Sequence, residues 1–247
     1  MFSGYYTIAS GLITNQRAIE TISNNIDNAL TPGYRSERVV KSSFEQELLS
    51  RMDSDGTASL SSRKGSPMTL IGGTMTSYEP GAIKETGRAL DVAINGEGFF
   101  SIRGTDGQNY LTRNGSFSID DEGYLTLAGF GRVQGATGDI RVGTSDIDIS
   151  SEGIIRDKQG NTLGTLSIIQ PADLNTLTRS ANGMFIGGGN TPSTGFEIIQ
   201  SSLESSNVDL NTEITNLIAA QRDLQSCASA LKIIDSMDRK SAQIASV

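Results

Sequence analysis

The 247-residue chain contains no histidine, no tryptophan and one cysteine. Without histidine it cannot form a Ser-His-Asp triad, a histidine-ligated zinc site or an imidazole pH switch. A lone cysteine excludes an intramolecular disulfide and a thiolate metal cluster. We interpret Cys227 as a small packing residue, because nothing of the imidazole type can activate it as a nucleophile. We therefore expect neither an enzyme nor a protein that holds a cofactor or a metal.

Long apolar runs and clusters of basic residues are also missing. No stretch approaches the roughly 18 apolar residues of a membrane-spanning helix, and the first residues lack the basic and apolar regions of a cleaved secretory signal. Asp and Glu number 28 against 20 Lys and Arg, which gives a formal net charge of −8. Because binding to phosphate requires clustered basic side chains, we expect no nucleic-acid partner and no direct membrane span.

What the chain does contain is an apolar stripe near each end. In the N-terminal segment apolar residues recur three and four positions apart, which predicts an amphipathic helix from Ser3 to Ala29. Pro32 disfavours helix in the residues before it, and Gly33 supplies a turn. The residues predicted to form the apolar seam of this helix are Ile8, Leu12, Ile19, Ile22 and Ile26.

A second stripe runs along the C-terminal segment, where leucine recurs at every seventh position. This pattern predicts a helix that ends near Ile244, with Ser206 or Asn207 as its N-cap and Asp209 favouring the helix dipole. Its predicted seam consists of Leu210, Ile214, Leu217, Leu224 and Leu231. Two long helices with apolar stripes at the chain ends favour a subunit that polymerises.

From Ala89 onward the chain changes to short runs of alternating apolar and polar residues. Turn-forming pairs such as Asn95-Gly96 and Asn114-Gly115 separate these runs. Regular spacing without intervening helices predicts an antiparallel all-β domain. The fold class is therefore α+β, with a central antiparallel all-β domain flanked by long N- and C-terminal α-helices.

Changes in composition divide the chain into four parts. Residues 1–35 form the N-terminal helix with its exit turn, and residues 36–80 form an extended connector that becomes rich in Ser, Gly and Thr. Residues 81–200 form the all-β domain, and residues 201–247 form the C-terminal helix.

Three segments, in the right order, resemble signature sequences of the axial proteins of the bacterial flagellum, especially its rod subunits. Residues 23–35, SNNIDNALTPGYR, are similar to that family's SNNLANANTPGYK signature. The segment LDVAINGEGFFSI, followed by YLTRNG, resembles the shared β-domain motif, and LESSNVDLNTEITNLIAAQR resembles the C-terminal signature. The residues that carry these motifs include Asn24, Asn25, Asn28, Pro32, Gly33, Asn95, Gly96, Gly98, Phe99, Phe100, Asn207, Gln221 and Arg222.

The resemblance implies a structural subunit of the flagellar basal-body rod, of either the proximal or the distal type, which transmits motor torque to the hook. It implies that the two terminal helices pair as a coiled coil in the inner layer of a helical polymer. The implied partners are copies of this chain, other rod and hook axial proteins, and the flagellar type III export apparatus. The implied location is the basal body in the cell envelope, outside the cytoplasmic membrane.

Two other classes of function stay open at this stage. Acidic residues of the β region, such as Asp120 and Asp146, could supply the carboxylate pair of a secreted cell-wall glycan hydrolase. Such a pair needs only a separation of about 5 to 10 Å. A fibre protein of a different surface appendage would also combine helical ends with a β-rich middle.

Overall fold

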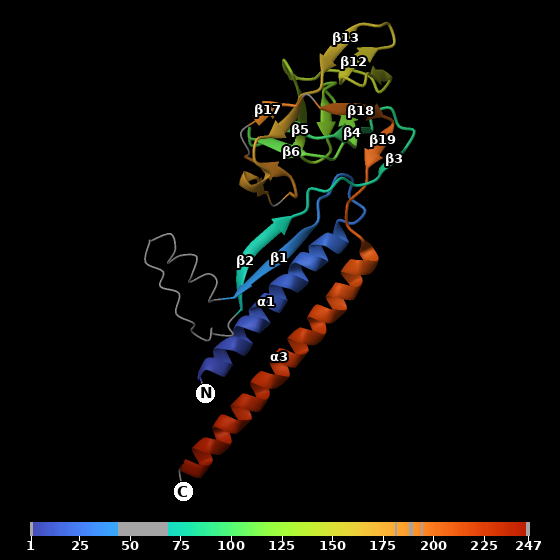
Figure 1. Cartoon of the computed structure of the whole chain (residues 1–247). Helices are drawn as coiled ribbons and strands as arrows, with labels where there is room; N and C mark the ends of the chain where they lie inside the picture. The colour runs from blue at the N-terminus through green and yellow to red at the C-terminus, as the bar shows by residue number, and fades with distance from the viewer. Residues whose placement is uncertain (1, 44–68, 181, 188–189, 194, 246–247) are drawn as a thin grey trace. The chain divides into compact units, whose positions relative to one another are not determined.

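The structure is a computed structural model that describes residues 2–43, 69–180, 182–187, 190–193 and 195–245 (Figure 1). The chain forms two compact units, and it passes from one to the other four times. The first, called here the helical unit, consists of Met1–Ala29, Arg35–Tyr78 and Val208–Val247. The second, called here the β unit, consists of Leu30–Tyr34 and Glu79–Asn207.

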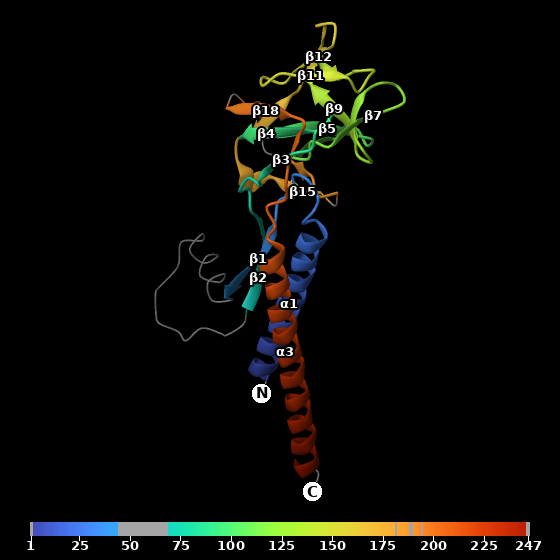
Figure 2. The same cartoon turned by 90° about the vertical axis from the view of Figure 1, so that its right-hand side faces the viewer.

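Two long helices dominate the helical unit. Helix α1 (Phe2–Asp27) has 26 residues and helix α3 (Leu210–Ala245) has 36. The two helices run side by side in opposite directions, and the C-terminal end of α3 continues beyond the start of α1 (Figures 1 and 2). Both helices predicted from the apolar stripes are confirmed. Among the described helices, none combines the length and the apolar character that a membrane crossing requires.

The helical unit also contains a two-stranded antiparallel sheet. Strand β1 (Glu37–Ser43) pairs with β2 (Thr69–Thr76), with an irregularity between Val40 and Lys41. The sequence predicted an extended connector over residues 36–80, whereas residues 37–43 and 69–76 of this segment form a pair of antiparallel strands. Residues 44–68 of that prediction lie outside the described residues. The pairing escaped prediction because no short turn joins the two strands, so no local turn signal marks them.

The β unit consists of short strands whose pairings are all antiparallel in the described residues. Its largest sheet has the order β15-β16-β6-β5-β9-β8-β7, with β10, β14 and β17 attached. The predicted antiparallel β domain is therefore confirmed. The strands of this sheet are β5 (Phe99–Gly104), β6 (Asn109–Thr112), β7 (Phe117–Ile119), β8 (Leu125–Leu127), β9 (Gly131–Gly135), β10 (Gly138–Asp139), β14 (Ile168–Pro171), β15 (Thr178–Arg179), β16 (Phe185–Ile186) and β17 (Asn190–Pro192).

Three smaller sheets complete the β unit. They are the pair β18 (Phe196–Gln200) with β4 (Val92–Gly96), the pair β19 (Ser202–Glu204) with β3 (Ile83–Glu85), and the set β11 (Ile147–Ile149), β12 (Ile154–Asp157) and β13 (Thr162–Thr165). A short 3-10 helix, η1 (Leu174–Thr176), precedes β15. Residues 201–207, predicted to belong with the C-terminal helix, lie in the β unit instead, because β19 pairs with a strand more than a hundred residues earlier.

A single apolar core fills the β unit. Its members come from the alternating runs, because successive side chains of a strand point to opposite faces and one face turns inward. Phe100 and Phe117 are fully buried and meet edge to face, with ring centroids 5.1 Å apart. The other completely or almost completely buried members include Val92, Ile94, Ile102, Leu125, Val133 and Ile155.

Candidate assembly site

Along α3, buried and half-buried residues recur with an alternating spacing of three and four positions. Leu217, Leu224 and Leu231, three of the predicted seam residues, are half-buried. The positions three residues after the first two leucines, Ala220 and Cys227, are buried and half-buried. On α1 the predicted seam residues are also half-buried, namely Ile8, Leu12, Ile19, Ile22 and Ile26.

Two contacts fix the antiparallel register of the helices. The Cys227 thiol lies 3.6 Å from the place where a Cβ atom on Gly11 would stand. Nearer the other end, the Asn25 amide donates a hydrogen bond to the Glu213 carboxylate over 3.2 Å. Because small residues face each other at Gly11 and Cys227, the helix backbones can come close at this level.

The first two residues of the predicted α3 seam take a different position. Leu210 and Ile214 are 38% and 47% exposed. The position four residues after a leucine, at Ile214 and Gln221, turns toward solvent, whereas the position three residues after it turns toward α1. The sequence prediction placed Ile214 in the seam. In the structure the small residues Ala220 and Cys227 face α1 instead, because close helix packing has no room for a larger side chain.

Asn25 joins three elements of the helical unit. Its side chain is 1% exposed. The amide oxygen accepts the Glu37 backbone N–H over 3.0 Å, and the amide nitrogen donates to the Glu37 carbonyl over 2.7 Å. The same nitrogen reaches Glu213 on α3. Asn25 therefore pairs with β1 as a neighbouring strand would, while it also ties α1 to α3.

The carboxyl group of Glu213 is perturbed by this position. Partial burial raises its pKa above the ordinary value, and the nearby Asp209 carboxylate adds to the rise, while the hydrogen bond from Asn25 opposes it. Ionisation of the Glu213 carboxyl group therefore costs more free energy here than it does in water.

The other N-terminal motif residues end α1 and begin the β unit. The Asn28 side chain donates to the Asn24 carbonyl over 2.9 Å, which adds to the bond that this carbonyl accepts from the Asn28 backbone N–H. Pro32 is half-buried. Gly33 has a φ of 67°, and a Cβ atom there would stand 2.3 Å from the Arg113 carbonyl carbon. A glycine is required at this position on both counts.

The β-domain motif residues serve the core and its turns. Asn95 donates to the Glu197 carboxylate over 3.4 Å at the exposed end of β4. Gly96 and Gly98 both have positive φ, and the motif then buries Phe99 and Phe100 at 4% and 0% exposure. These residues shape the β unit and offer little surface to a partner.

A buried ion pair lies near the exit of the β unit. Arg113 and Glu204 are 3.2 Å apart, with side-chain exposures of 7% and 1%. Arg113 also donates to the carbonyls of Ile94 and Gly96 over 3.1 and 2.7 Å. Sequence reasoning missed this pair, although both residues fall within the quoted motifs. The signal available in the sequence was Arg113, the single charged residue of the motif YLTRNG.

The C-terminal motif begins with a cap that differs from the predicted one. Asp209 is the N-cap of α3, because its carboxylate accepts the Asn211 N–H over 3.1 Å and the Thr212 hydroxyl over 2.7 Å. These two donors, with the hydroxyl contributing most, lower the pKa of Asp209. Asn207 instead donates its side-chain amide to the Glu79 carbonyl over 3.0 Å. The predicted caps, Ser206 and Asn207, lie just before the helix begins, in the β unit.

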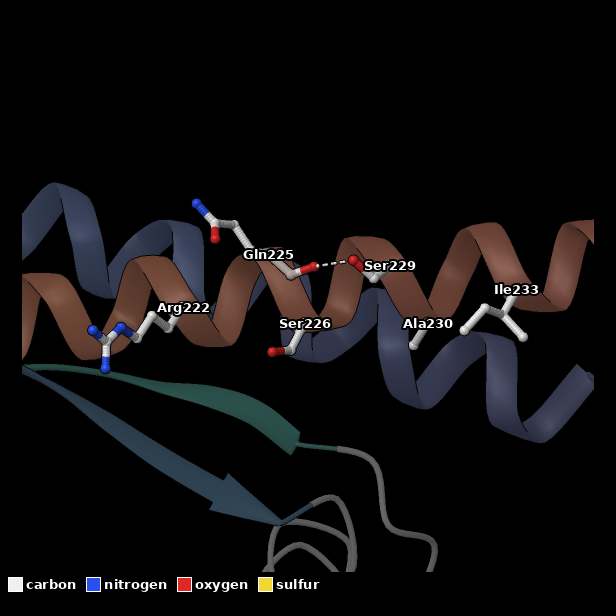
Figure 3. A pocket seen from close by; sticks show the side chains of 6 residues that line it. All are labelled: Arg222, Gln225, Ser226, Ser229, Ala230 and Ile233. Atoms are coloured by element: carbon white, nitrogen blue, oxygen red, sulfur yellow. Dashed lines mark hydrogen bonds between the residues drawn. The ribbon is translucent and has the colours of Figure 1, made fainter.

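Gln221 and Arg222 both face solvent on α3. Arg222 lines a shallow depression together with Gln225, Ser226, Ser229, Ala230 and Ile233 (Figure 3). The Ser229 hydroxyl donates to the Gln225 carbonyl over 2.9 Å, so this hydroxyl is already bonded within the helix itself. We assign no ligand to this surface.

Both helices keep large apolar side chains outside their common seam. In addition to Leu210 and Ile214, these are Tyr5, Tyr6, Ile13, Ile218, Ile233 and Met237, each about half exposed or more. Isolated exposed apolar residues are common, whereas these are spread along two adjacent helices.

The carboxylates considered for a hydrolase are engaged elsewhere. Burial alone would raise the pKa of Asp120, but the Tyr124 amide and the Arg132 guanidinium outweigh it, so its pKa lies below the ordinary value. Asp146 is paired with Lys158. A general acid of a glycosidase needs a raised pKa. Asp120, whose pKa is lowered, does not fit that role.

Three family models match the chain in consecutive segments. Residues 6–35 match "Flagella basal body rod protein", residues 93–185 match "Flagellar hook protein FlgE/F/G D1 domain", and residues 199–244 match "Flagellar basal body rod FlgEFG protein C-terminal".

Whole proteins are similar over almost their entire length. The flagellar basal-body rod protein FlgG of Bacillus subtilis is 32% identical, with 96% of each chain covered. FlgF of Caulobacter vibrioides, another flagellar basal-body rod protein, is 29% identical, with 98% of each chain covered. The flagellar hook-basal body complex protein FlhO of Bacillus subtilis is 27% identical over the full length of both chains.

Proposed function

Because this chain belongs to the family of flagellar basal-body rod proteins, we propose that it is a structural subunit of the rod. It polymerises through its terminal helices into the shaft that transmits motor torque to the hook. The observation that carries this function is the set of large apolar side chains that α1 and α3 leave exposed after forming their own seam. A rod subunit needs such a surface, because contacts that do not close into a ring generate a helical assembly.

The two helices act as one antiparallel coiled coil. The alternating three-and-four spacing at Leu217, Ala220 and Leu224 supports this pairing. The contact between Gly11 and Cys227 supports the same register. In this assignment the predicted seam residues of α1 and three leucines of α3, Leu217, Leu224 and Leu231, hold the helices together. Leu210 and Ile214 belong to the surface that meets other subunits.

The partners are other axial proteins of the flagellum, including copies of this chain. The flagellar type III export apparatus is a further partner in this proposal, since a subunit of the rod must leave the cytoplasm. The location is the flagellar basal body. We assign no catalytic role, in keeping with carboxylates such as Asp120 that are committed to ion pairs and turns.

The exposed apolar face of α3 provides the test. Ile218→Asp places a charge on a side chain that is 47% exposed, so the isolated protein should keep its fold while an apolar contact between subunits is lost. We expect motility and the yield of intact basal bodies to fall at least tenfold in cells that carry this variant alone. The measurement combines swimming assays with electron microscopy of isolated basal bodies.

A matched control is Asn216→Asp, which adds the same charge at an exposed polar residue on the same turn of α3. It should reduce assembly much less, because no apolar side chain is lost. Circular dichroism of both purified variants checks that the helices persist. Normal basal bodies with Ile218→Asp, together with normal basal bodies when Ile233→Asp is added, would show that this face does not mediate assembly.

A further inference from the structure

The segments that connect the β unit to the rest of the chain are bound to one another. Three segments lie next to the four crossings, namely residues 30–34, 79–82 and 204–207, and all belong to the β unit. The Gly33 N–H donates to the Glu204 carbonyl over 2.8 Å, and the Asn207 N–H donates to the Tyr34 carbonyl over 3.3 Å. The Ser205 N–H donates to the Ala82 carbonyl over 2.8 Å. Residues 204–207 are thus bonded both to residues 30–34 and to residues 79–82.

Side chains of the last segment reinforce these backbone bonds. One carboxylate oxygen of Glu204 accepts the Gly81 N–H over 3.0 Å. The Asn207 amide binds the carbonyl of Glu79. A Cβ atom on Gly81 would stand 1.9 Å from the Ser205 carbonyl oxygen, so the two backbones touch directly.

The cluster is anchored in the core through Arg113. The other carboxylate oxygen of Glu204 binds this guanidinium, which in turn binds two carbonyls of β4 and lies 5.4 Å from the Phe99 ring centroid. Gly33 also lies against the Arg113 backbone. A buried charge pair of this kind is weak evidence for stability alone, because removing two charges from water costs much of what their attraction supplies. The position of the Arg113–Glu204 pair, next to the segments that connect the two units, indicates a role other than stability.

We propose that Glu204, Asn207 and Arg113 form a mechanical clamp that makes the three connecting segments bear load together. The proposal rests on the rod function, since a subunit of a rotating shaft receives force through its connections. A pull on residues 30–34 passes through the hydrogen bonds to residues 204–207, and from Glu204 through Arg113 into β4. Several bonds must then break at once, which raises the force needed to open the β unit.

Stretching a single molecule of the full chain by its two ends tests the clamp. When α1 and α3 have unravelled, force enters the β unit at residues 30 and 207, while the clamp bypasses the inserted residues 35–78. In the unaltered chain we expect release of this insertion and unfolding of the β unit in one event. At about 3.5 Å per residue, that event lengthens the chain by ~620 Å.

Asn207→Ala and Glu204→Gln should divide this event into two. A first step of ~170 Å, from residues 30–78, should occur at a lower force, followed by a step of ~450 Å from the β unit. Asn207→Ala removes only the polar side chain at the rim of the cluster, so it tests the clamp even if Glu204→Gln fails to fold. The control is Ile155→Val, which weakens the core at a fully buried site outside the clamp. It should lower the force without dividing the event.

A separate ~170 Å step at low force in the unaltered chain would overturn the clamp, and so would an undivided event in both clamp variants. Division of the event by Ile155→Val would also overturn it. The stretching experiment does not require a rod. Its failure therefore leaves the proposed function intact, whereas normal basal bodies with the α3 variants would remove the rod assembly surface without changing the stretching result.

Discussion

At the scale of single residues, Asn25 shows how a polar side chain can organise a helical unit. It binds the backbone of Glu37 as a neighbouring strand would, because its amide carries the same donor and acceptor as a peptide group. Its third bond reaches Glu213. A buried amide that satisfies three groups in this way cannot be exchanged for an apolar residue of similar size without leaving them unpaired.

Asn25→Ala should therefore destabilise the helical unit by about 2 to 4 kcal/mol, because a buried polar group that loses its partner costs about 1 to 3 kcal/mol. Urea unfolding followed by circular dichroism of the helices measures this change. Asn24→Ala is the control, since Asn24 is the exposed neighbour on the same helix turn. Equal stability of the two variants would contradict the role given to Asn25.

At the scale of elements, α3 combines two surfaces on one helix. One side carries the half-buried leucines and the small residues that face α1, and other sides carry Leu210 and the exposed isoleucines. Because α3 is longer than α1 and runs past its start, its last turns have no partner in α1 (Figure 1). Helix propensity alone sustains such an end weakly, so contacts with another chain would add to its stability.

Gly11→Cys tests the helix register at this scale. A Cβ atom at residue 11 would stand 3.6 Å from the Cys227 thiol, which is within the range that a disulfide needs after small adjustments. Mild oxidation should therefore crosslink α1 to α3 within one chain, and mass spectrometry of a digest should find the linked peptides. Ile13→Cys, on an exposed position of α1, should not form this crosslink. Efficient linkage at residue 13 but not at residue 11 would exclude the register.

At the scale of the whole molecule, the two units differ in how much apolar surface they bury. Among the described residues that are apolar and buried, Ala220 belongs to the helical unit, and all the others belong to the β unit. The β unit therefore has a core of its own. The helical unit relies on half-buried seam residues and on polar links, so we expect it to be the less stable part of the free subunit.

Hydrogen exchange on the free and polymerised protein tests this difference. Peptides from residues 2–27 and 210–245 should exchange faster than peptides of β5 and β6 in the free protein, because local opening of the helical unit costs less free energy. Polymerisation should protect both helices and leave the β unit unchanged. Helices as well protected as β5 in a free subunit that does not assemble would contradict the prediction and favour an ordinary core helix pair.

The sequence by itself determined the elements whose signal is local. The period of the apolar residues specified α1 and α3, and the alternation with glycine turns specified the antiparallel β domain. The signature motifs marked Asn25, Gly33 and Asn207 as important without assigning their contacts. In a seven-residue repeat, the second seam residue can lie three positions before or three positions after a leucine. For Leu217 these positions are Ile214 and Ala220, and periodicity could not choose between them.

Tertiary structure alone decided the features that join distant segments. The pairing of β1 with β2, the ion pair of Arg113 with Glu204, and the transfer of residues 201–207 to the β unit all connect residues far apart in the sequence. Such contacts depend on which distant segments the folded chain brings together. They leave no pattern among residues that are adjacent in the sequence. The helices and strands follow from short-range periodicity, whereas the arrangement that holds them in place follows from packing and buried hydrogen bonds.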